Sequence, residues 1–185
     1  MALFLLEYPA AAGDREEVRP LFDRVADAVQ TAGGEFIEAQ VPTGLDRAYI
    51  VVEHPEEAGL RAALEQGGAT PGGVAQVRLV GASLDDVKAA RNAADADYLV
   101  EWDFPAGLAM DTYLERKKAK SPLYAQVPEV RFLRTYVCED MTKCLCFYQA
   151  QDEAAVRRAR EVVSTPITRL SPLAGGGAGG AGAPA

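Results

Sequence analysis

The chain has 185 residues, enough for one large domain or two small ones. Hydrophobic residues make up 49% and charged residues 25%, a composition that supports a packed core and excludes wholesale disorder. Nineteen basic against 27 acidic side chains give a formal net charge of −8, which disfavours a phosphate-backbone partner. The apolar start, residues 1–6, is too short for a signal peptide or a membrane span. We therefore expect a globular, cytoplasmic protein that binds neither nucleic acid nor membrane.

The first half predicts six elements in a fixed order. Residues 2–8 are short, apolar and followed by a proline, as in a strand. A helix follows, whose apolar residues recur at intervals of three and four: Val18, Leu21, Phe22, Val25, Ala26 and Val29. Residues 35–41 and 47–53 form a hairpin, Pro55 opens a second helix, and residues 74–80 form a fourth strand. The order is strand, helix, strand, strand, helix, strand.

The second half repeats this order, with its elements at residues 98–102, 110–120, 130–137, 143–149, 152–163 and 167–170. With an offset of 96 positions, residues 37–63 align with residues 133–159 without a gap. Only 5 of these 27 pairs are identical, so the shared order of elements is the stronger evidence for an internal repeat.

Each half has the element order of a ferredoxin-like unit, a four-stranded antiparallel sheet with both helices on one face. The bare faces of two such sheets can cover each other. The predicted fold class is therefore α+β, with two tandem ferredoxin-like (βαββαβ) repeats packed sheet to sheet as an intramolecular pseudo-dimeric α+β barrel. We expect repeats at residues 1–81 and 97–173, a connecting helix or linker at 82–96, and a disordered Gly/Ala/Pro tail at 174–185. The chain would be a monomeric pseudo-dimer or a homodimer.

Three segments of the second half carry a family resemblance: Tyr-Leu-Val-Glu at 98–101, Leu-Arg-Thr-Tyr at 133–136 and Cys-Leu-Cys-Phe-Tyr-Gln-Ala at 144–150. With these motifs in this order, residues 97–172 resemble a small bacterial family of uncharacterised ferredoxin-like domains, best known through a nickel-binding member. The resemblance implies a dimeric α+β barrel and the position of its pocket.

The metal chemistry of that family is not expected to transfer to this chain. Family members often have a Glu-Arg-His segment at the end of the first strand, which reads Glu101-Trp102-Asp103 here. The one histidine of the chain, His54, lies in the other half. Because nickel sites favour imidazole nitrogen, we do not expect a histidine-rich nickel site.

The space between the two sheets is the expected ligand site. Strand alternation places Glu101 on the open face of its strand, and puts Phe132, Arg134 and Tyr136 on one face of theirs. The candidate catalytic residues are Glu101, Arg134 and Tyr136, because a carboxylate in an apolar cavity can act as an acid or a base. The alternative is a structural ion pair between Glu101 and Arg134. The candidate ligand-binding residues are Glu7, Glu38, Gln40, Trp102 and Tyr148.

The three cysteines form a second candidate site. Cys144 and Cys146 lie two apart on a strand, and Cys138 lies across the hairpin loop. Thiolates so placed could hold copper(I) or zinc, or Cys138 and Cys144 could form a redox disulfide. In the other interpretation Cys144 and Cys146 are buried apolar residues and Cys138 is an exposed thiol. We predict no metal and no cofactor, with a transition metal at Cys138, Cys144 and Cys146 as the alternative.

Two basic runs, residues 115–120 and 157–160, are interpreted as solvated helix faces, because they are short and the chain is acidic.

The predicted function is that of a small-molecule-binding α+β barrel protein, with a cofactor-independent isomerase, cyclase or oxygenase activity on an apolar metabolite as one form. The alternatives are a transition-metal-binding or thiol-based protein like the nickel-binding family member, and a non-catalytic interaction module. Only the analogy of fold supports an enzyme, and one fold hosts many activities, so the sequence leaves open whether the protein is an enzyme.

Overall fold

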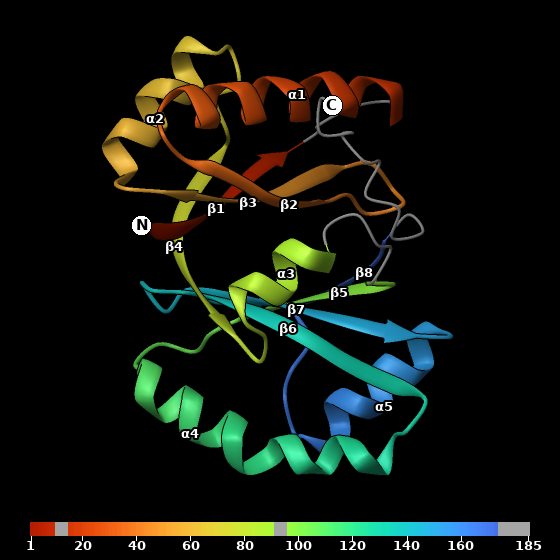
Figure 1. The fold of residues 1–185 in the computed structure, drawn as a ribbon. Coiled ribbons are helices and arrows are strands. Elements are labelled where there is room, and N and C mark those ends of the chain that lie inside the picture. The colour runs from red at the N-terminus through yellow and green to blue at the C-terminus, as the bar shows by residue number, and fades with distance from the viewer. Residues whose placement is uncertain (10–14, 91–95, 174–185) are drawn as a thin grey trace.

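The computed structural model describes residues 1–9, 15–90 and 96–173 (Figure 1). The predicted tail, residues 174–185, and the end of the predicted connecting helix lie outside these residues. The elements of the first half are β1 (Ala2–Pro9), α1 (Arg15–Thr31), β2 (Glu35–Gln40), β3 (Arg47–His54), α2 (Glu57–Gln66) and β4 (Gly73–Val80). The helix α3 (Leu84–Ala90) connects them to β5 (Tyr98–Asp103), α4 (Met110–Lys120), the 3₁₀ helix η1 (Ser121–Gln126), β6 (Val130–Cys138), β7 (Lys143–Ala150), α5 (Glu153–Val162) and β8 (Arg169–Pro172).

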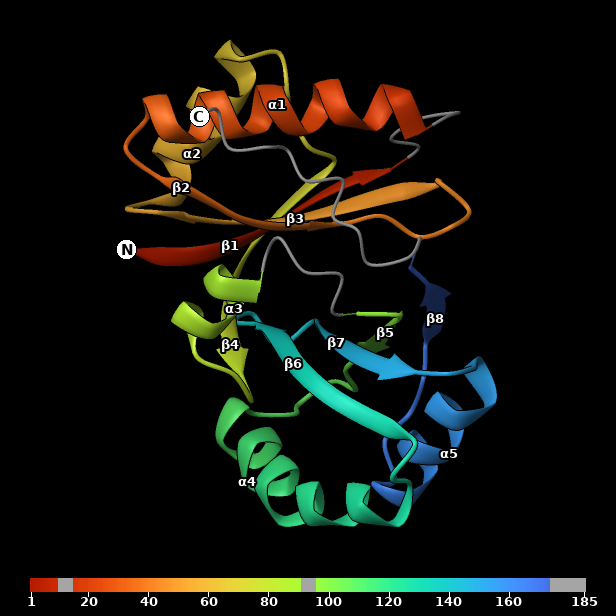
Figure 2. The ribbon, with the colours of Figure 1, turned by 45° about the vertical axis from the view of Figure 1, so that its right-hand side comes forward.

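The eight strands form one antiparallel sheet in the order β2-β3-β1-β4-β6-β7-β5-β8. The halves of the sheet join where β4 pairs with β6, from Val77 opposite Cys138 to Val80 opposite Thr135. At the other junction an isolated bridge joins Pro42 to Leu173. Figures 1 and 2 show α1 and α2 on one outer side and α4 and α5 on the opposite side, with both halves of the sheet between them. The α+β class is confirmed, and none of the described helices is long and apolar enough to span a membrane.

Strand alternation divides the buried apolar side chains into three layers. In β1, Phe4 and Leu6 pack under α1 and α2, whereas Leu5 points toward the other half of the sheet. In β5, Val100 packs under α4 and α5, whereas Leu99 points toward the first half. The layer between the two half-sheets holds Leu5, Ile37, Tyr49, Val51, Val77, Leu99, Tyr136, Leu145 and Phe147, among other side chains.

Two β-bulges change this alternation. One lies in β2 between Phe36 and Glu38, and the other in β6 between Phe132 and Arg134, at positions 96 residues apart. A bulge inserts one residue, so the side chains before it point to the opposite face from the one that simple alternation predicts. Phe132 therefore packs on the helix side of the sheet and Leu133 against the layer between the half-sheets. The expectation that Phe132 shares a face with Arg134 is wrong for this reason.

We expect the apolar layer between the half-sheets to contribute strongly to the free energy of unfolding. Leu145→Ala removes a fully buried side chain from this layer and is expected to lower the free energy of unfolding by about 2–5 kcal/mol. Gln149→Ala, at an exposed position of the same strand, should change it by less than about 0.5 kcal/mol. Urea unfolding followed by circular dichroism measures both, and similar values for the two variants would contradict the role given to the layer.

Candidate functional site

Four of the predicted site residues, Glu38, Gln40, Arg134 and Tyr136, meet between the two half-sheets. Arg134 donates from Nε to Oε1 of Glu38 at 2.9 Å and from Nη2 to Oε2 at 2.6 Å. The Tyr136 hydroxyl donates to Oε1 of Glu38, and Gln40 donates to Oε2 at 3.3 Å. Burial and the Glu38 carboxylate raise the pKa of Tyr136 well above its usual value, so its hydroxyl stays protonated. Arg134 thus forms a two-point ion pair with Glu38, its counterpart at the offset of 96, where the sequence suggested a pair with Glu101.

Glu7 and Glu101, one from each half, are brought together by a lysine that sequence reasoning missed. Nζ of Lys143 lies 2.6 Å from Oε1 of Glu7 and 3.4 Å from Oε1 of Glu101, and Arg169 lies 3.6 Å from Glu101. Burial lowers the pKa of Lys143, but the hydrogen bonds and charges of Glu7 and Glu101 together outweigh this effect and raise it. At the offset of 96, Lys143 corresponds to Arg47, a conservative match that could have pointed to it. The carboxylates are therefore ion-paired, and the catalytic role of Glu101 and the ligand-binding role of Glu7 stay predictions.

The cysteines lie on two faces of the sheet and do not converge. Cys138 is buried in the layer between the half-sheets, so the expectation of an exposed thiol is wrong. Cys144 and Cys146 are buried on the opposite face, under the helices, with their sulfur atoms 3.8 Å apart. All three thiols are free, so the suggested disulfide between Cys138 and Cys144 is absent. Nowhere in residues 1–9, 15–90 and 96–173 do three or more His, Cys, Asp or Glu side chains gather into one potential metal-binding group.

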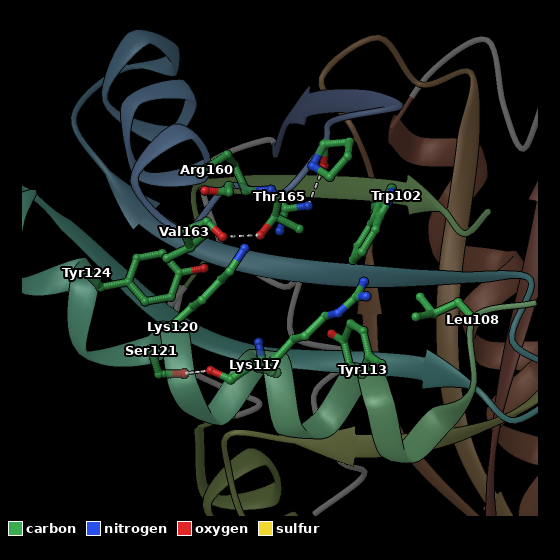
Figure 3. Close-up of a pocket in the computed structure, with 13 residues that line it drawn as sticks. Trp102, Leu108, Tyr113, Lys117, Lys120, Ser121, Tyr124, Arg160, Val163 and Thr165 are labelled. Atoms are coloured by element: carbon green, nitrogen blue, oxygen red, sulfur yellow. Dashed lines mark hydrogen bonds between the residues drawn. The ribbon is translucent and has the colours of Figure 1, made fainter.

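The remaining predicted residues, Trp102 and Tyr148, lie on the helix side of the second half-sheet. Trp102 lines a cavity there (Figure 3), and Tyr148 contacts the lining residues Tyr124 and Arg160. This cavity has a volume of about 270 Å³ and lies between β5, α4, η1, α5 and the segment after α5. Its lining includes the aromatic side chains of Trp102, Tyr113 and Tyr124 and the basic side chains of Arg116, Lys117, Lys120 and Arg160. The interpretation of both basic runs as solvated helix faces is therefore wrong for the buried Arg160 and the half-buried Lys117 and Lys120, whereas Arg116 is exposed as expected.

Arg160 is the most deeply placed of these cations, with 3% of its surface exposed. Its Nη1 lies 3.2 Å from the Tyr148 hydroxyl and 3.5 Å from the sulfur of Cys146. Its Nε is buried without a hydrogen-bond partner in the described part of the chain. Tyr148 in turn shares a hydrogen bond of 2.9 Å with Tyr124. The guanidinium is thus held by the Tyr148 hydroxyl, the Pro166 carbonyl and the sulfur of Cys146, with Nε unused.

Lys117 approaches the same region from α4. Its Nζ lies 3.4 Å from the Thr135 hydroxyl and 4.0 Å above the centre of the Phe132 ring. Burial lowers the pKa of Lys117. Among the described residues neither Lys117 nor Arg160 forms an ion pair with a carboxylate.

The pKa values of the neighbouring titratable groups also depart from their usual values. Burial raises the pKa of Tyr113 and of Tyr124, so both hydroxyls are protonated at neutral pH. The hydrogen bond with Cys144, followed by the charges of Arg160 and Lys117, lowers the pKa of Cys146 against the opposing effect of burial. The arrangement of cations and hydroxyl donors around an open space is suited to holding a negatively charged group.

Comparison with known proteins agrees with this architecture. The family model described as "Nickel responsive protein SCO4226-like" matches residues 98–173, which is less than half of the chain, and confirms the family resemblance predicted for that segment. No curated protein matches the chain.

Two solved structures are similar over nearly the whole chain. One is a provisionally assigned monooxygenase from Lactobacillus acidophilus, at 12% identity and a TM-score of 0.51, covering 94% of this chain and 93% of that one. The other is a provisionally assigned chlorite dismutase, at 14% identity and a TM-score of 0.52, covering 96% of this chain and 97% of that one. At such low identity these similarities establish the fold alone.

The ion pair between the half-sheets gives a stability prediction. Glu38→Ala leaves the Arg134 guanidinium buried without its carboxylate and should lower the free energy of unfolding by about 3–5 kcal/mol. The double variant Glu38→Ala, Arg134→Met removes both charges and should be less destabilised than Glu38→Ala alone. Urea unfolding of the wild-type protein and these two variants measures this, and a double variant that is no more stable than Glu38→Ala would contradict the cost assigned to the unpaired Arg134.

Proposed function

We propose that this protein binds a small organic anion in the cavity between the second half-sheet and helices α4 and α5. The observation that carries the proposal is that Lys117 and Arg160 line this cavity and have no carboxylate partner in the described residues. Taking a cation out of water costs several kcal/mol unless an anion compensates it. The chain has 27 acidic side chains, yet none of those in the described residues lines this cavity. A ligand that brings its own negative charge is the natural compensation.

The rest of the lining supports a ligand with an acidic head and an apolar or aromatic body. Trp102, Leu108 and Tyr113 provide apolar surface, and Figure 3 shows them at the end of the cavity away from Lys120 and Ser121. A volume of about 270 Å³ lies near the lower limit of small-molecule sites, so the ligand should be small. The positive charges of Lys117 and Arg160 can compensate a carboxylate or phosphate head bound in this cavity.

We further infer that the chain is a tandem pseudo-dimer with repeats at 1–81 and 97–173, and that only the second repeat carries the anion site. The shared element order, the strand order within each half and the two bulges 96 residues apart support the repeat. At the same offset, the buried Leu64 occupies the position of Arg160. The first half therefore has an apolar side chain where the second has its buried cation.

The hypothesis of a cofactor-independent isomerase, cyclase or oxygenase using Glu101, Arg134 and Tyr136 stays a prediction. The anion site has the stronger support, because Lys117 and Arg160 have no carboxylate partner among the described residues, whereas Glu101, Arg134 and Tyr136 are bound to charged side chains.

Binding of simple aromatic anions tests the proposal. Benzoate and phenyl phosphate, titrated by protein-observed NMR, should shift resonances of residues around the cavity, and Arg160→Met should weaken binding by at least about 30-fold. Arg158→Ala, on the same helix but exposed and paired with Glu129, should leave the affinity unchanged. Loss of affinity in both variants, or in neither, would refute a specific site at Arg160.

Stability separates a binding role of Arg160 from a structural one. Because the ligand-free protein buries this cation without a carboxylate, Arg160→Met should be as stable as the wild-type protein or more stable. Thermal unfolding without ligand measures this. A marked decrease in stability would indicate that Arg160 serves the fold.

The affinity for the anion should depend on pH through Lys117. An ordinary lysine has a pKa of about 10.4. Burial lowers the pKa of Lys117, so this side chain loses its charge at a lower pH. Affinity should therefore fall as the pH rises from about 7 toward about 10, and Lys117→Arg should remove this dependence because arginine stays charged. Titrations across this range measure both proteins, and identical pH profiles would exclude Lys117 as the titrating group.

A further inference from the structure

A pair of thiols lies directly behind the cavity, and neither has a role in anion binding. We propose that Cys144 and Cys146 bind one soft monovalent metal ion, copper(I), as two thiolates. This inference goes beyond the proposed anion site and does not depend on it. The sulfur atoms lie 3.8 Å apart on the same face of β7. Since a metal–thiolate bond is about 2.3 Å long for zinc, one ion lying between the two sulfur atoms can reach both.

The groups around the thiols can stabilise negative charge on sulfur. The hydroxyl of Thr135 donates to the sulfur of Cys146 at 3.1 Å, and Nη1 of Arg160 lies 3.5 Å from the same sulfur. Lys117 lies within 3.4 Å of the Thr135 hydroxyl. A purely apolar pair of buried cysteines needs neither a hydroxyl donor nor two nearby cations.

The positive charges of Lys117 and Arg160 favour a monovalent over a divalent ion at these thiolates. Two thiolates and one monovalent ion carry one net negative charge, which Lys117 and Arg160 attract. Two thiolates and a divalent ion are neutral, so the cations gain nothing and repel the ion itself. Zinc and nickel also require further ligands, and within the described ranges no third His, Cys, Asp or Glu completes a group with these cysteines. Soft thiolates favour copper(I), which accepts few ligands.

The binding step is a ligand exchange without oxidation. Two S–H bonds break, two copper–sulfur bonds form, both protons go to solvent, and copper remains monovalent. The ion has a short route, because Tyr113, Lys117 and Arg160 line the cavity, and Arg160 also contacts Cys146. A single layer of side chains therefore separates the cavity from the thiols.

Cysteine variants test this site with a control inside the same chain. Reduced protein is titrated without oxygen against the copper(I) complex of bicinchoninate, whose absorbance reports the copper that the protein removes. We expect the wild-type protein to take up one equivalent, Cys144→Ser and Cys146→Ser to lose this uptake, and Cys138→Ser to retain it, since Cys138 faces the other side of the sheet. Lys117→Met should weaken the affinity about tenfold, through the loss of one favourable charge.

A measurement on the wild-type protein covers the case in which a cysteine variant fails to fold. X-ray absorption of the copper-loaded protein should show two sulfur atoms as the nearest neighbours of copper. No uptake by the wild-type protein, equal loss in Cys138→Ser, a nitrogen or oxygen shell around copper, or preferential binding of nickel(II) would each overturn the proposal.

Discussion

Each half of the sheet has an apolar face that none of the helices α1, α2, α4 and α5 covers, and the burial of these two faces against each other determines the rest of the arrangement. Leu5 and Val51 from the first half and Leu99 and Phe147 from the second fill the space between them. Burial of such side chains is the main favourable contribution to folding. Because the bare faces turn inward, both pairs of helices lie outside, where they are free to form sites of their own (Figure 2).

The side chains under α1 and α2 differ in character from those under α4 and α5. Under α1 and α2, the position of Leu64 completes an apolar core. Under α4 and α5, Arg160 occupies the equivalent position. Likewise, Cys144 and Cys146 of β7 occupy the positions of Ala48 and Ile50 of β3. Arg160, Cys144 and Cys146 thus lie together under the helices of the second half. The proposed anion and metal sites both follow from this local exchange of apolar residues for reactive ones.

The alternation of apolar residues predicted the order of elements and the face of most strand residues, because one face of each half-sheet packs against helices. It failed at Phe132 and Leu133, because a bulge adds a residue that a period of two cannot represent. It also failed for the partner of Arg134. The pair with Glu38 joins residues far apart in the sequence, so only the packing of the half-sheets reveals it.

The cavity escaped prediction for a different reason. A basic run in an acidic chain normally faces solvent, and nothing in residues 157–160 distinguishes the buried Arg160 from the exposed Arg157 and Arg158 except helical spacing. Arg160 lies four and five positions after the buried Val156 and Ala155, on the apolar face of α5. An arginine on that face was the one available signal of a buried charge. The predicted ligand-binding residues Trp102 and Tyr148 lie on the helix side of the second half-sheet, where Trp102 lines this cavity, and not between the half-sheets.

The central claim is that the cavity beside Lys117 and Arg160 attracts negative charge, and anomalous scattering from bromide tests it most directly. Crystals soaked in bromide should show a strong anomalous peak inside the cavity, within contact distance of Arg160 and Lys117. Bromide ordered only on the outer surface, with the cavity holding none, would contradict the account.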